Sequence, residues 1–264
     1  MKVAIIGCGV MGSAFARFLV KKHEVFLCGK DQEKLKALSS EIGAPVEKTE
    51  LACKKAEVIL LAFKPKDLAI AAKEISAFTE GKILISILTS TDSSVLKSYF
   101  PKAHIVRTMP NLAITLGEGV IGIADHINDT VKDKVASILT GMGLIYFLPE
   151  SKIDAFTALC GSSPAFVLVI LEAMMEGGVS FGFSFADSEK LIIKVFEGTL
   201  ALLKASGKHA VELKMQISSP GGTTIAGLNE MEQQGVRSGL IKTLFACYHR
   251  AQEIGRQQNK PQGS

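Results

Sequence analysis

The sequence predicts a two-domain protein, in which an α/β half with a doubly wound sheet precedes an all-helical half. The chain has 264 residues, which is long for one compact domain and natural for two. Up to about residue 150, short apolar runs alternate with amphipathic segments, as strands and helices do in an α/β domain. After Pro149 no strand-like run follows and the apolar spacing is helical. We therefore place a first domain at residues 1–150 and a second at residues 151–264.

Seven apolar runs of the first half are predicted to be strands. They lack an alternation of apolar and polar residues, which suits strands buried on both faces of a parallel sheet. They cover residues 3–6, 25–28, 58–63, 83–88, 105–108, 120–124 and 145–148. Helical segments between the early strands indicate crossover connections, and these segments cover residues 13–22, 31–40 and 67–78.

Helices are predicted throughout the second half. For the helix that begins near Ala186, Ser184 or Asp187 is available as the N-terminal cap, and Gly207 lies just beyond its end. Several of these helices are apolar on all sides, so they must pack in a bundle or against another subunit. The predicted helices cover residues 153–159, 165–179, 186–205, 223–234 and 236–257, and a polar tail covers residues 257–264.

Composition and charge argue against several classes of protein. Apolar residues make up 47% of the chain and charged residues 21%, which excludes disordered and fibrous proteins. The formal charge of +4 comes from 30 basic and 26 acidic residues scattered along the chain, so no nucleic-acid partner is expected. The longest apolar stretch, residues 165–171, ends at Glu172, and no membrane span is expected.

Cysteine usage and the amino terminus favour a cytoplasmic protein. The five cysteines are an odd number, widely spaced and without a Cys-x-x-Cys pair, which argues against a disulfide framework and a zinc site. The histidines share no metal-ligand spacing, so no metal is expected. Lys2 is followed at once by a short apolar run and a glycine turn, unlike a signal peptide.

A glycine-rich turn near the amino terminus predicts a dinucleotide-binding domain of the Rossmann type. The turn has the spacing Gly-x-Gly-x-x-Gly, directly after the first strand and at the start of the first helix. Its glycines would make a tight turn, admit a pyrophosphate and let helix and strand pack closely. An ordinary glycine-rich strand-to-helix turn is the alternative. The coenzyme-binding residues predicted in this turn are Gly7, Gly9, Val10, Met11 and Gly12.

The end of the second strand predicts NADPH as the coenzyme, with NADH as the alternative. NAD enzymes carry Asp or Glu about 20 residues after the glycine motif, whereas this strand ends without a carboxylate. Lys30 would neutralise a 2′-phosphate, and Asp31 and Glu33 are interpreted as the acidic start of the next helix. Further coenzyme contacts are predicted after the third strand, at Ala62, Phe63, Lys64 and Pro65.

Two loops rich in serine and proline precede helices of the second half. The first is Gly161-Ser162-Ser163-Pro164, and the second covers residues 218–224 with the sequence Ser-Ser-Pro-Gly-Gly-Thr-Thr. Each is in part a helix start, with hydroxyl caps and a proline. The second loop offers further donors at one helix amino terminus, which suits a small carboxylate. It carries no acid–base pair, so the sequence favours a site of hydrogen-bond donors that leaves the chemistry to a nicotinamide.

Five motifs together make the chain resemble pyrroline-5-carboxylate reductases. In order they are Gly7-x-Gly9-x-Met11-Gly12, Lys64-Pro65, Arg107-Thr108-Met109-Pro110-Asn111, Gly161-Ser162-Ser163-Pro164-Ala165 and Ser218-Ser219-Pro220-Gly221-Gly222-Thr223-Thr224-Ile225. The resemblance implies a Rossmann domain that binds NAD(P)H and a helical domain that forms a homodimer, with a ring of dimers as a further assembly. It also implies reduction of the cyclic imine L-1-pyrroline-5-carboxylate to L-proline, the last step of proline biosynthesis.

The same resemblance implies roles for single residues. The backbone N–H groups of Gly222 and Thr223 and the hydroxyl of Ser219 would bind the substrate carboxylate. Thr224 would also contact the substrate and be the catalytic residue, with its hydroxyl bonded to the ring nitrogen and water as the source of the proton. Two roles are open for Arg107: a clamp on the carboxylate or, as we favour, a structural anchor for the loop that follows it.

The sequence departs from the family at some positions, and two other functions compete. Leu88-Thr89-Ser90 replaces the family's Ala-Ala-Gly beside the coenzyme, Leu112-Ala113 replaces Thr-Pro, and Met215 replaces an aspartate. One alternative is a β-hydroxyacid dehydrogenase, which needs a lysine in the helical domain, and Lys190 and Lys194 lack that family's surroundings. The other is a dinucleotide-binding redox sensor, which the intact substrate loop disfavours.

Overall fold

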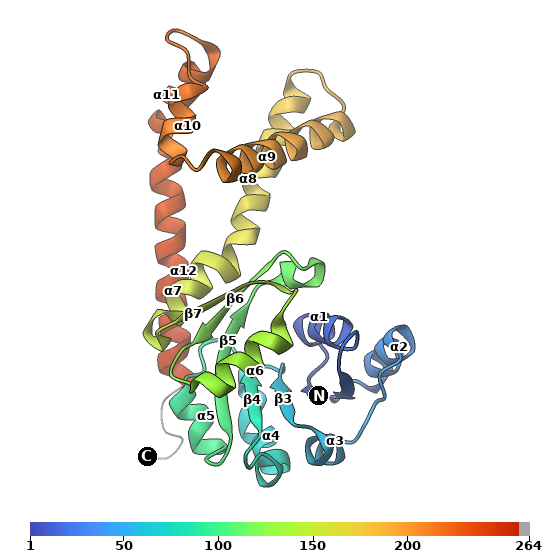
Figure 1. Cartoon of the computed structure of the whole chain (residues 1–264). Helices are drawn as coiled ribbons and strands as arrows, with labels where there is room; N and C mark the ends of the chain where they lie inside the picture. Colours follow the sequence, from blue (N-terminus) through green and yellow to red (C-terminus); the bar gives the residue numbers. More distant parts are fainter. Residues whose placement is uncertain (259–264) are drawn as a thin grey trace. The chain divides into compact units, whose positions relative to one another are not determined.

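The computed structural model describes residues 1–258, and the chain divides into two compact units (Figure 1). The first unit contains residues 1–161 together with the chain from Cys247 onward, and the second contains residues 162–246. Residues 257 and 258 belong to the last helix, so the polar tail does not begin at residue 257. The rest of the predicted tail, residues 259–264, lies outside the described residues.

A seven-stranded sheet forms the centre of the first unit, and each strand predicted from the sequence is present. The strand order is β2-β1-β3-β4-β5-β6-β7, and all neighbours are parallel except β5 and β6. The expectation of a parallel sheet is wrong at this pair because only a short 3-10 turn, Leu112–Leu116, joins its two strands. The strands are β1 (Lys2–Ile6), β2 (Glu24–Cys28), β3 (Val58–Leu61), β4 (Ile83–Ser86), β5 (His104–Pro110), β6 (Gly119–Ala124) and β7 (Gly143–Leu148).

Helices cover both faces of the sheet and bury two separate apolar cores. The first core includes Phe15, Leu35 and Ile138, and the second includes Ile75 and Leu96. Side chains of the central strands alternate between these cores, which is why the strands form continuous apolar runs in the sequence. The first core is covered by α1 (Val10–Leu19), α2 (Gln32–Ile42) and α6 (Asp129–Leu139), and the second by α3 (Thr49–Lys55), α4 (Leu68–Ile75) and α5 (Ser93–Tyr99).

The start and the end of the helical half pack with the first unit, so the two units do not divide at residue 150. After a 3-10 turn, α7 (Ile153–Phe156) buries its first and last side chains in a cluster with Met109 and Leu148. At the other end of this half, Ala251 is buried, and its carbonyl oxygen accepts a hydrogen bond from the hydroxyl of Ser90 at 3.1 Å. Burial of these apolar side chains holds both segments against the sheet.

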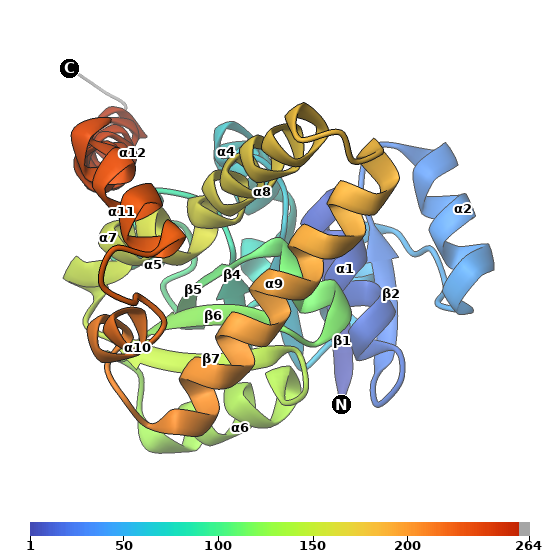
Figure 2. The same ribbon diagram turned by 90° about the horizontal axis from the view of Figure 1, so that it is seen from above.

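Helices make up the second unit, as the sequence predicts. The chain leaves α7 through a π-helical turn, and α8 turns back into α9 (Figure 2). Ser184 caps α9, because its hydroxyl accepts the N–H of Asp187 at 3.1 Å, and Gly207 ends that helix in the left-handed conformation. The helices are α8 (Ser163–Ser180), α9 (Phe185–Ser206), α10 (Ala210–Gln216), α11 (Thr223–Gln233) and α12 (Val236–Gln258), the last of which ends in the first unit.

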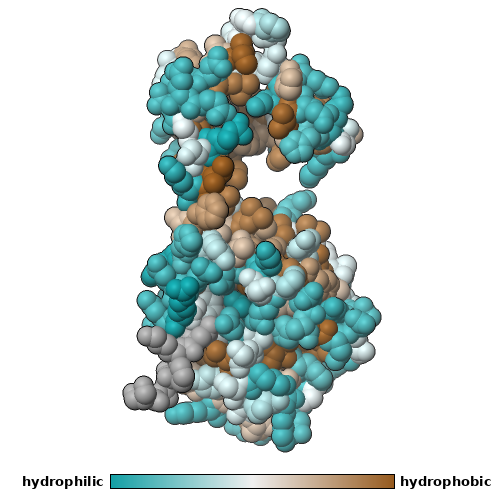
Figure 3. Space-filling model, turned by 90° about the vertical axis from the view of Figure 1, so that its left-hand side faces the viewer, coloured by the Kyte–Doolittle hydropathy of each residue, from teal (hydrophilic) through white to brown (hydrophobic). Residues whose placement is uncertain are grey.

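The second unit has no apolar core of its own. Among residues 162–246, Ser188 is the only buried residue, and Leu168 and Phe181 are 64% and 83% exposed. Brown apolar surface is visible over helices in the upper part of Figure 3. By length and composition alone, the helical run Glu150–Ser180 could also cross a membrane, which is weak evidence because core helices of soluble proteins pass the same test. Exposed apolar surface of this extent marks an interaction site.

Candidate active site

The glycine turn has the backbone geometry that a dinucleotide site needs. Gly7 has φ +97°, a left-handed value that favours glycine, and its N–H donates to the carbonyl oxygen of Cys28 at 2.8 Å. A Cβ atom on Gly12 would lie 1.9 Å from the carbonyl oxygen of Gly7, so α1 approaches the turn this closely only with glycine there. Gly9 is the N-cap of α1 and brings no side chain to its N–H groups. The start of α1 is therefore open to an anion.

A cavity of about 540 Å³ lies beside this turn. It brings together Gly7 and Gly9 with Lys30, after β2, and with Phe63 and Lys64, after β3. These two strands lie on either side of β1, where the chain order reverses, and open α/β sheets bind ligands at such a point. The other residues predicted to bind coenzyme do not line the cavity, and they are Val10, Met11, Gly12, Ala62 and Pro65.

Acidic neighbours pair with two of the basic side chains of this cavity, Lys30 and Lys34. Lys30 Nζ lies 2.8 Å from Asp67 Oδ1, and Lys34 Nζ lies 3.0 Å from Asp31 Oδ2. Asp31 also accepts the N–H of Lys34 and so caps α2, in agreement with its interpretation as a helix start. The hydrogen bond from Lys30 holds the pKa of Asp67 below its usual value. Sequence reasoning missed Lys34 and Asp67, although Asp67 follows the Lys64-Pro65 motif by two residues.

The thiol of Cys8 lines the cavity without being reactive. Burial raises its pKa to about 11, so the side chain stays protonated at neutral pH. Within residues 1–258, His, Cys, Asp and Glu side chains form no group of three that could hold a metal ion. The polar character of the cavity therefore comes from backbone N–H groups and from the charged side chains.

The second predicted site lies at the start of α11, in the second unit. The N–H of Gly222 donates to the carbonyl oxygen of Ser219 at 3.1 Å, so in this structure it is engaged within the loop, and its bond to a carboxylate stays a prediction. Gly222 is the N-cap of α11, and no side chain caps the N–H groups that follow. Ser219, Thr223 and Thr224 are exposed around this helix start. The free donors are therefore the N–H groups of Thr223 and Thr224 and the nearby hydroxyls.

Comparisons with known proteins match both halves of the chain. A family model described as pyrroline-5-carboxylate reductase dimerisation matches residues 150–254, and one described as NADP oxidoreductase, coenzyme F420-dependent, matches residues 2–90. A pyrroline-5-carboxylate reductase of Synechocystis is 33% identical over 97% of this chain and 99% of the relative. The chain belongs to the pyrroline-5-carboxylate reductase family.

Other members of the family support the same assignment. The pyrroline-5-carboxylate reductase of Aquifex aeolicus is 33% identical over 96% of this chain and 97% of the relative. A crystal structure of the Plasmodium falciparum pyrroline carboxylate reductase with NADP bound has 26% identity and a TM-score of 0.87, covering 97% of this chain and 98% of that one. The predicted fold class, a Rossmann-like domain followed by a helical domain, is thereby confirmed.

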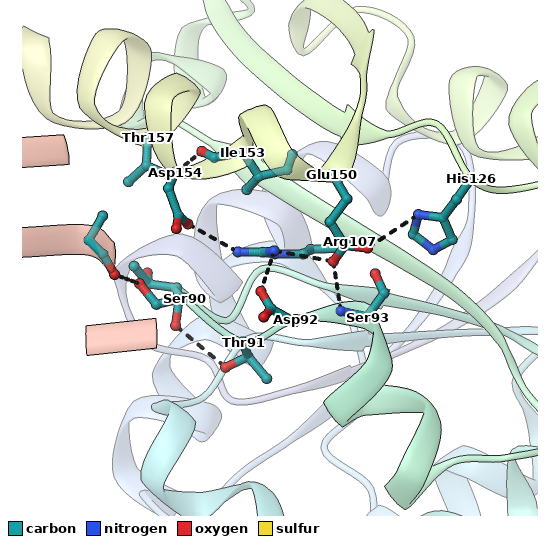
Figure 4. Close-up of polar contacts among 12 residues, drawn as sticks. Ser90, Thr91, Asp92, Ser93, Arg107, His126, Glu150, Ile153, Asp154 and Thr157 are labelled. Atoms are coloured by element: carbon teal, nitrogen blue, oxygen red, sulfur yellow. Dashed lines mark hydrogen bonds and ion pairs between the residues drawn. The ribbon is translucent and has the colours of Figure 1, made fainter. Parts of the chain in front are cut away.

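Arg107 on β5 is the centre of a buried charge cluster in this reductase (Figure 4). Its side chain is 3% exposed, and its guanidinium lies 2.7 Å from Asp92, 3.2 Å from Glu150 and 3.3 Å from Asp154. All three carboxylates belong to the first unit, two of them to the turn and helix that begin the helical half. The guanidinium is buried and paired with three carboxylates of the chain itself, which favours the structural role of Arg107 over a clamp on a substrate carboxylate.

The anchor differs from the predicted one. Arg107 holds the chain at Asp92 and Glu150, whereas the loop after β5 is held by Asn111. The side-chain amide of Asn111 donates to the carbonyl oxygen of Cys160 at 3.2 Å and accepts the N–H of Val120 at 3.1 Å. The partners of Asn111 lie outside the motif. The motif alone therefore did not show that Asn111, and not Arg107, holds the loop after β5.

The pKa shifts in the cluster have opposite directions. Burial raises the pKa of Asp92, and the nearby carboxylates of Glu150 and Asp154 act in the same direction against Arg107. Although burial also acts on Glu150, hydrogen bonds from Ser93 and Arg107 hold the pKa of Glu150 below its usual value. The N–H of Ser93 donates to Glu150 at 2.7 Å. Asp92 is thus a carboxylate of the cluster whose ionised form the surroundings disfavour.

Proposed function

We propose that this protein reduces L-1-pyrroline-5-carboxylate to L-proline, the last step of proline biosynthesis, with NADPH as the preferred reductant. The observation that carries the proposal is the open start of α11, where Ser219, Thr223 and Thr224 are exposed around Gly222. A site of donors without an acid–base pair suits an anionic imine, whose reduction needs only a hydride and a proton. Membership of the family across the whole chain supports the same reaction.

The substrate carboxylate binds at the start of α11. The N–H groups of Thr223 and Thr224 point out of the first helical turn, and the positive end of the helix dipole favours a negative charge there. The hydroxyl of Ser219 adds a donor at the same place. Because Gly222 gives its N–H to Ser219, it shapes this loop and leaves the binding to the next two residues.

The hydroxyl of Thr224 bonds the ring nitrogen of the imine. NADPH, when bound, supplies the hydride that adds to the imine carbon, so the C=N bond becomes CH–NH with one proton on nitrogen. Thr224 orients that proton, and water supplies it, since a threonine hydroxyl is a poor acid at pH 7. The chain contributes positioning and exclusion of water more than acid–base chemistry.

The coenzyme is held in the first unit. The open start of α1 at Gly9 fits a pyrophosphate, and the cavity beside it has room for an organic ligand. Lys30 lies at the end of β2, where NADP enzymes bind the 2′-phosphate. These features fit a dinucleotide, and they support NADPH over NADH through the lysine charge.

The active form is a homodimer in the cytoplasm, with a ring of dimers as the larger assembly. The exposed apolar helices of residues 162–246 support pairing with a second copy, because a soluble monomer does not leave such a surface uncovered. The match of the dimerisation model to residues 150–254 supports the same surface.

Absorbance at the nicotinamide band tests the reaction. NADPH should be oxidised when pyrroline-5-carboxylate is added, in amounts equal to the proline formed. A second reaction contains NADP⁺ and a 3-hydroxy acid, the substrate class of the alternative dehydrogenase. Turnover of the hydroxy acid without turnover of the imine contradicts the proposal. Binding of NADPH without either reaction would indicate the redox sensor.

A further inference from the structure

The loop between β4 and α5, residues 87–92, is held in a strained conformation. Ser90 has φ +56°, and within residues 1–258 it is the only residue other than glycine with a positive φ. A left-handed conformation is unfavourable for a side chain with a Cβ atom. Such a conformation persists only where the surrounding contacts fix it.

Contacts with both ends of the helical half fix this loop. The hydroxyl of Ser90 donates to the carbonyl oxygen of Ala251 in α12 at 3.1 Å. Asp92 pairs with Arg107, and the next residue, Ser93, donates its N–H to Glu150 (Figure 4). Ser90, Thr91 and Ser93 are all buried. The loop is therefore tied to the end of α12 and to the turn before α7.

Arg107 is the group that joins these ties. Its guanidinium bonds Asp92 from the loop, and Glu150 and Asp154 from the start of the helical half. A buried fork with several carboxylate partners fixes geometry in a way that a single point charge does not. Removing it would leave three carboxylates close together in a partly buried place.

The loop lies at the edge of the sheet where the coenzyme site is. β4 is the neighbour of β3, whose following residues Phe63 and Lys64 line the cavity at the glycine turn. Lys30 lies on the opposite side of that turn, after β2. A dinucleotide with its 2′-phosphate near Lys30 therefore extends its nicotinamide half toward the end of β4.

We propose that Arg107 is a positioning residue for hydride transfer, because it fixes the loop of residues 87–92 that borders the nicotinamide. This inference rests on the proposed function. Arg107 touches neither substrate nor coenzyme, so it acts through Asp92 and Glu150. Loss of its fork should loosen the loop and misplace the nicotinamide while leaving the phosphate and carboxylate contacts intact.

The test compares Arg107→Lys with Arg17→Lys, a matched control. Arg17 also forms a two-bond fork, to Glu41, but on the exposed surface of the first unit. We expect Arg107→Lys to lower kcat about tenfold, since small misplacements of reacting groups have large effects on rate. KM for the imine and the Kd of NADPH measured by calorimetry should stay within about twofold, because the carboxylate and phosphate contacts stay intact. NADPH deuterated at the transferred position should give a larger isotope effect, and Arg17→Lys should change none of these values.

Amide hydrogen exchange gives a readout that does not depend on activity. Exchange over residues 87–93 should become faster in Arg107→Lys, and unchanged over β1. If Arg107→Lys does not fold, Asp154→Asn removes one tie and should give the same changes to a smaller extent. Unchanged kcat or unchanged loop exchange in a folded variant overturns the proposal. If the unmodified protein does not reduce the imine, the proposed function fails. Faster amide exchange over residues 87–93 in Arg107→Lys would then still show that Arg107 fixes the loop.

Discussion

Lys30 is the residue on which the expected preference for NADPH depends, and its charge is shared with Asp67. The ion pair of 2.8 Å fixes the lysine at the rim of the coenzyme cavity, with 77% of its side chain exposed. A 2′-phosphate would have to compete with Asp67 for the same ammonium group. Asp67 therefore lowers the contribution of Lys30 to NADPH binding, although Asp67 also orients the lysine side chain.

Substitutions at this pair should separate the two coenzymes. Lys30→Ala should raise KM for NADPH about three- to tenfold, because a charged hydrogen bond of an exposed group contributes about 1 kcal/mol. Asp67→Asn should tighten NADPH binding. Lys30→Ala should weaken the salt dependence of NADPH binding more than Asp67→Asn does. Neither change should affect NADH much. Steady-state kinetics with both coenzymes measures this, and a higher kcat/KM for NADH in the unmodified protein would show that the strand end was misread.

Substitutions at the start of α11 should separate catalysis from binding. Thr224→Ala should lower kcat about tenfold or more, since a hydrogen bond to a charged group contributes about 1.5–3 kcal/mol. Ser219→Ala should act mainly on KM for the imine, because the carboxylate contact changes little between ground and transition state. The Kd of NADPH should stay normal in both variants. If Thr224→Ala keeps full kcat at saturating imine, Thr224 serves only as a residue of the helix start and has no catalytic role.

At the scale of elements, two carboxylates with opposite pKa shifts meet at Arg107: Glu150 from the turn before α7, and Asp92 from the loop before α5. The lowered pKa of Glu150 means that its ionised form stabilises the fold above its unfolded pKa, and this stability is lost as pH falls through its folded pKa. The raised pKa of Asp92 has the opposite sign: its contribution is complete below the unfolded pKa and is lost as pH rises through the folded pKa. At neutral pH the ionisation of Glu150 therefore favours the folded state, whereas the ionisation of Asp92 does not.

The two isosteric substitutions should have opposite effects on the melting temperature. At pH 7, Glu150→Gln should lower Tm by about 2–4 °C, as expected for ~1 kcal/mol in a chain of this size. Asp92→Asn should leave Tm unchanged or raise it, since asparagine keeps the size of the side chain and removes a negative charge from a cluster of three carboxylates. The deficit of Glu150→Gln should shrink as pH falls below the usual range of a glutamate. Equal losses of Tm in both variants would contradict these pKa directions.

The elements that sequence could predict are those with a long or strong local pattern. The seven strands follow from apolar runs, and α8, α9, α11 and α12 follow from helical spacing, within a few residues at their ends. α3, α5 and α10 were missed because each has only seven residues, too few to show a period. α6 was missed although Asn128 caps it and its buried face has helical spacing. The partners of Arg107 lie 15 to 47 residues away in the chain, where no local pattern indicates them.

At the scale of the whole molecule, the two units differ in how they are stabilised. The first unit buries two apolar cores on the faces of its sheet. In residues 162–246 no apolar side chain is buried, so these helices lack the burial that normally offsets the entropy of folding. We expect a second chain to supply the missing burial, which would couple folding of this unit to association.

A charge on the apolar helical face should separate the subunits. Leu168 of α8 is 64% exposed, and Leu168→Glu would place a carboxylate on this face at a large desolvation penalty on pairing. Leu51→Glu is the matched control, since Leu51 is 42% exposed on α3 of the first unit. Light scattering should give at least about 56 kDa for the unmodified protein and for Leu51→Glu, twice the chain mass of 28.2 kDa, and a smaller mass for Leu168→Glu.

The Tm of the unmodified protein should rise with protein concentration, because association stabilises the folded helices by mass action. A 28.2 kDa species of the unmodified protein at micromolar concentration, with a Tm independent of concentration, would show that the helical unit is stable alone.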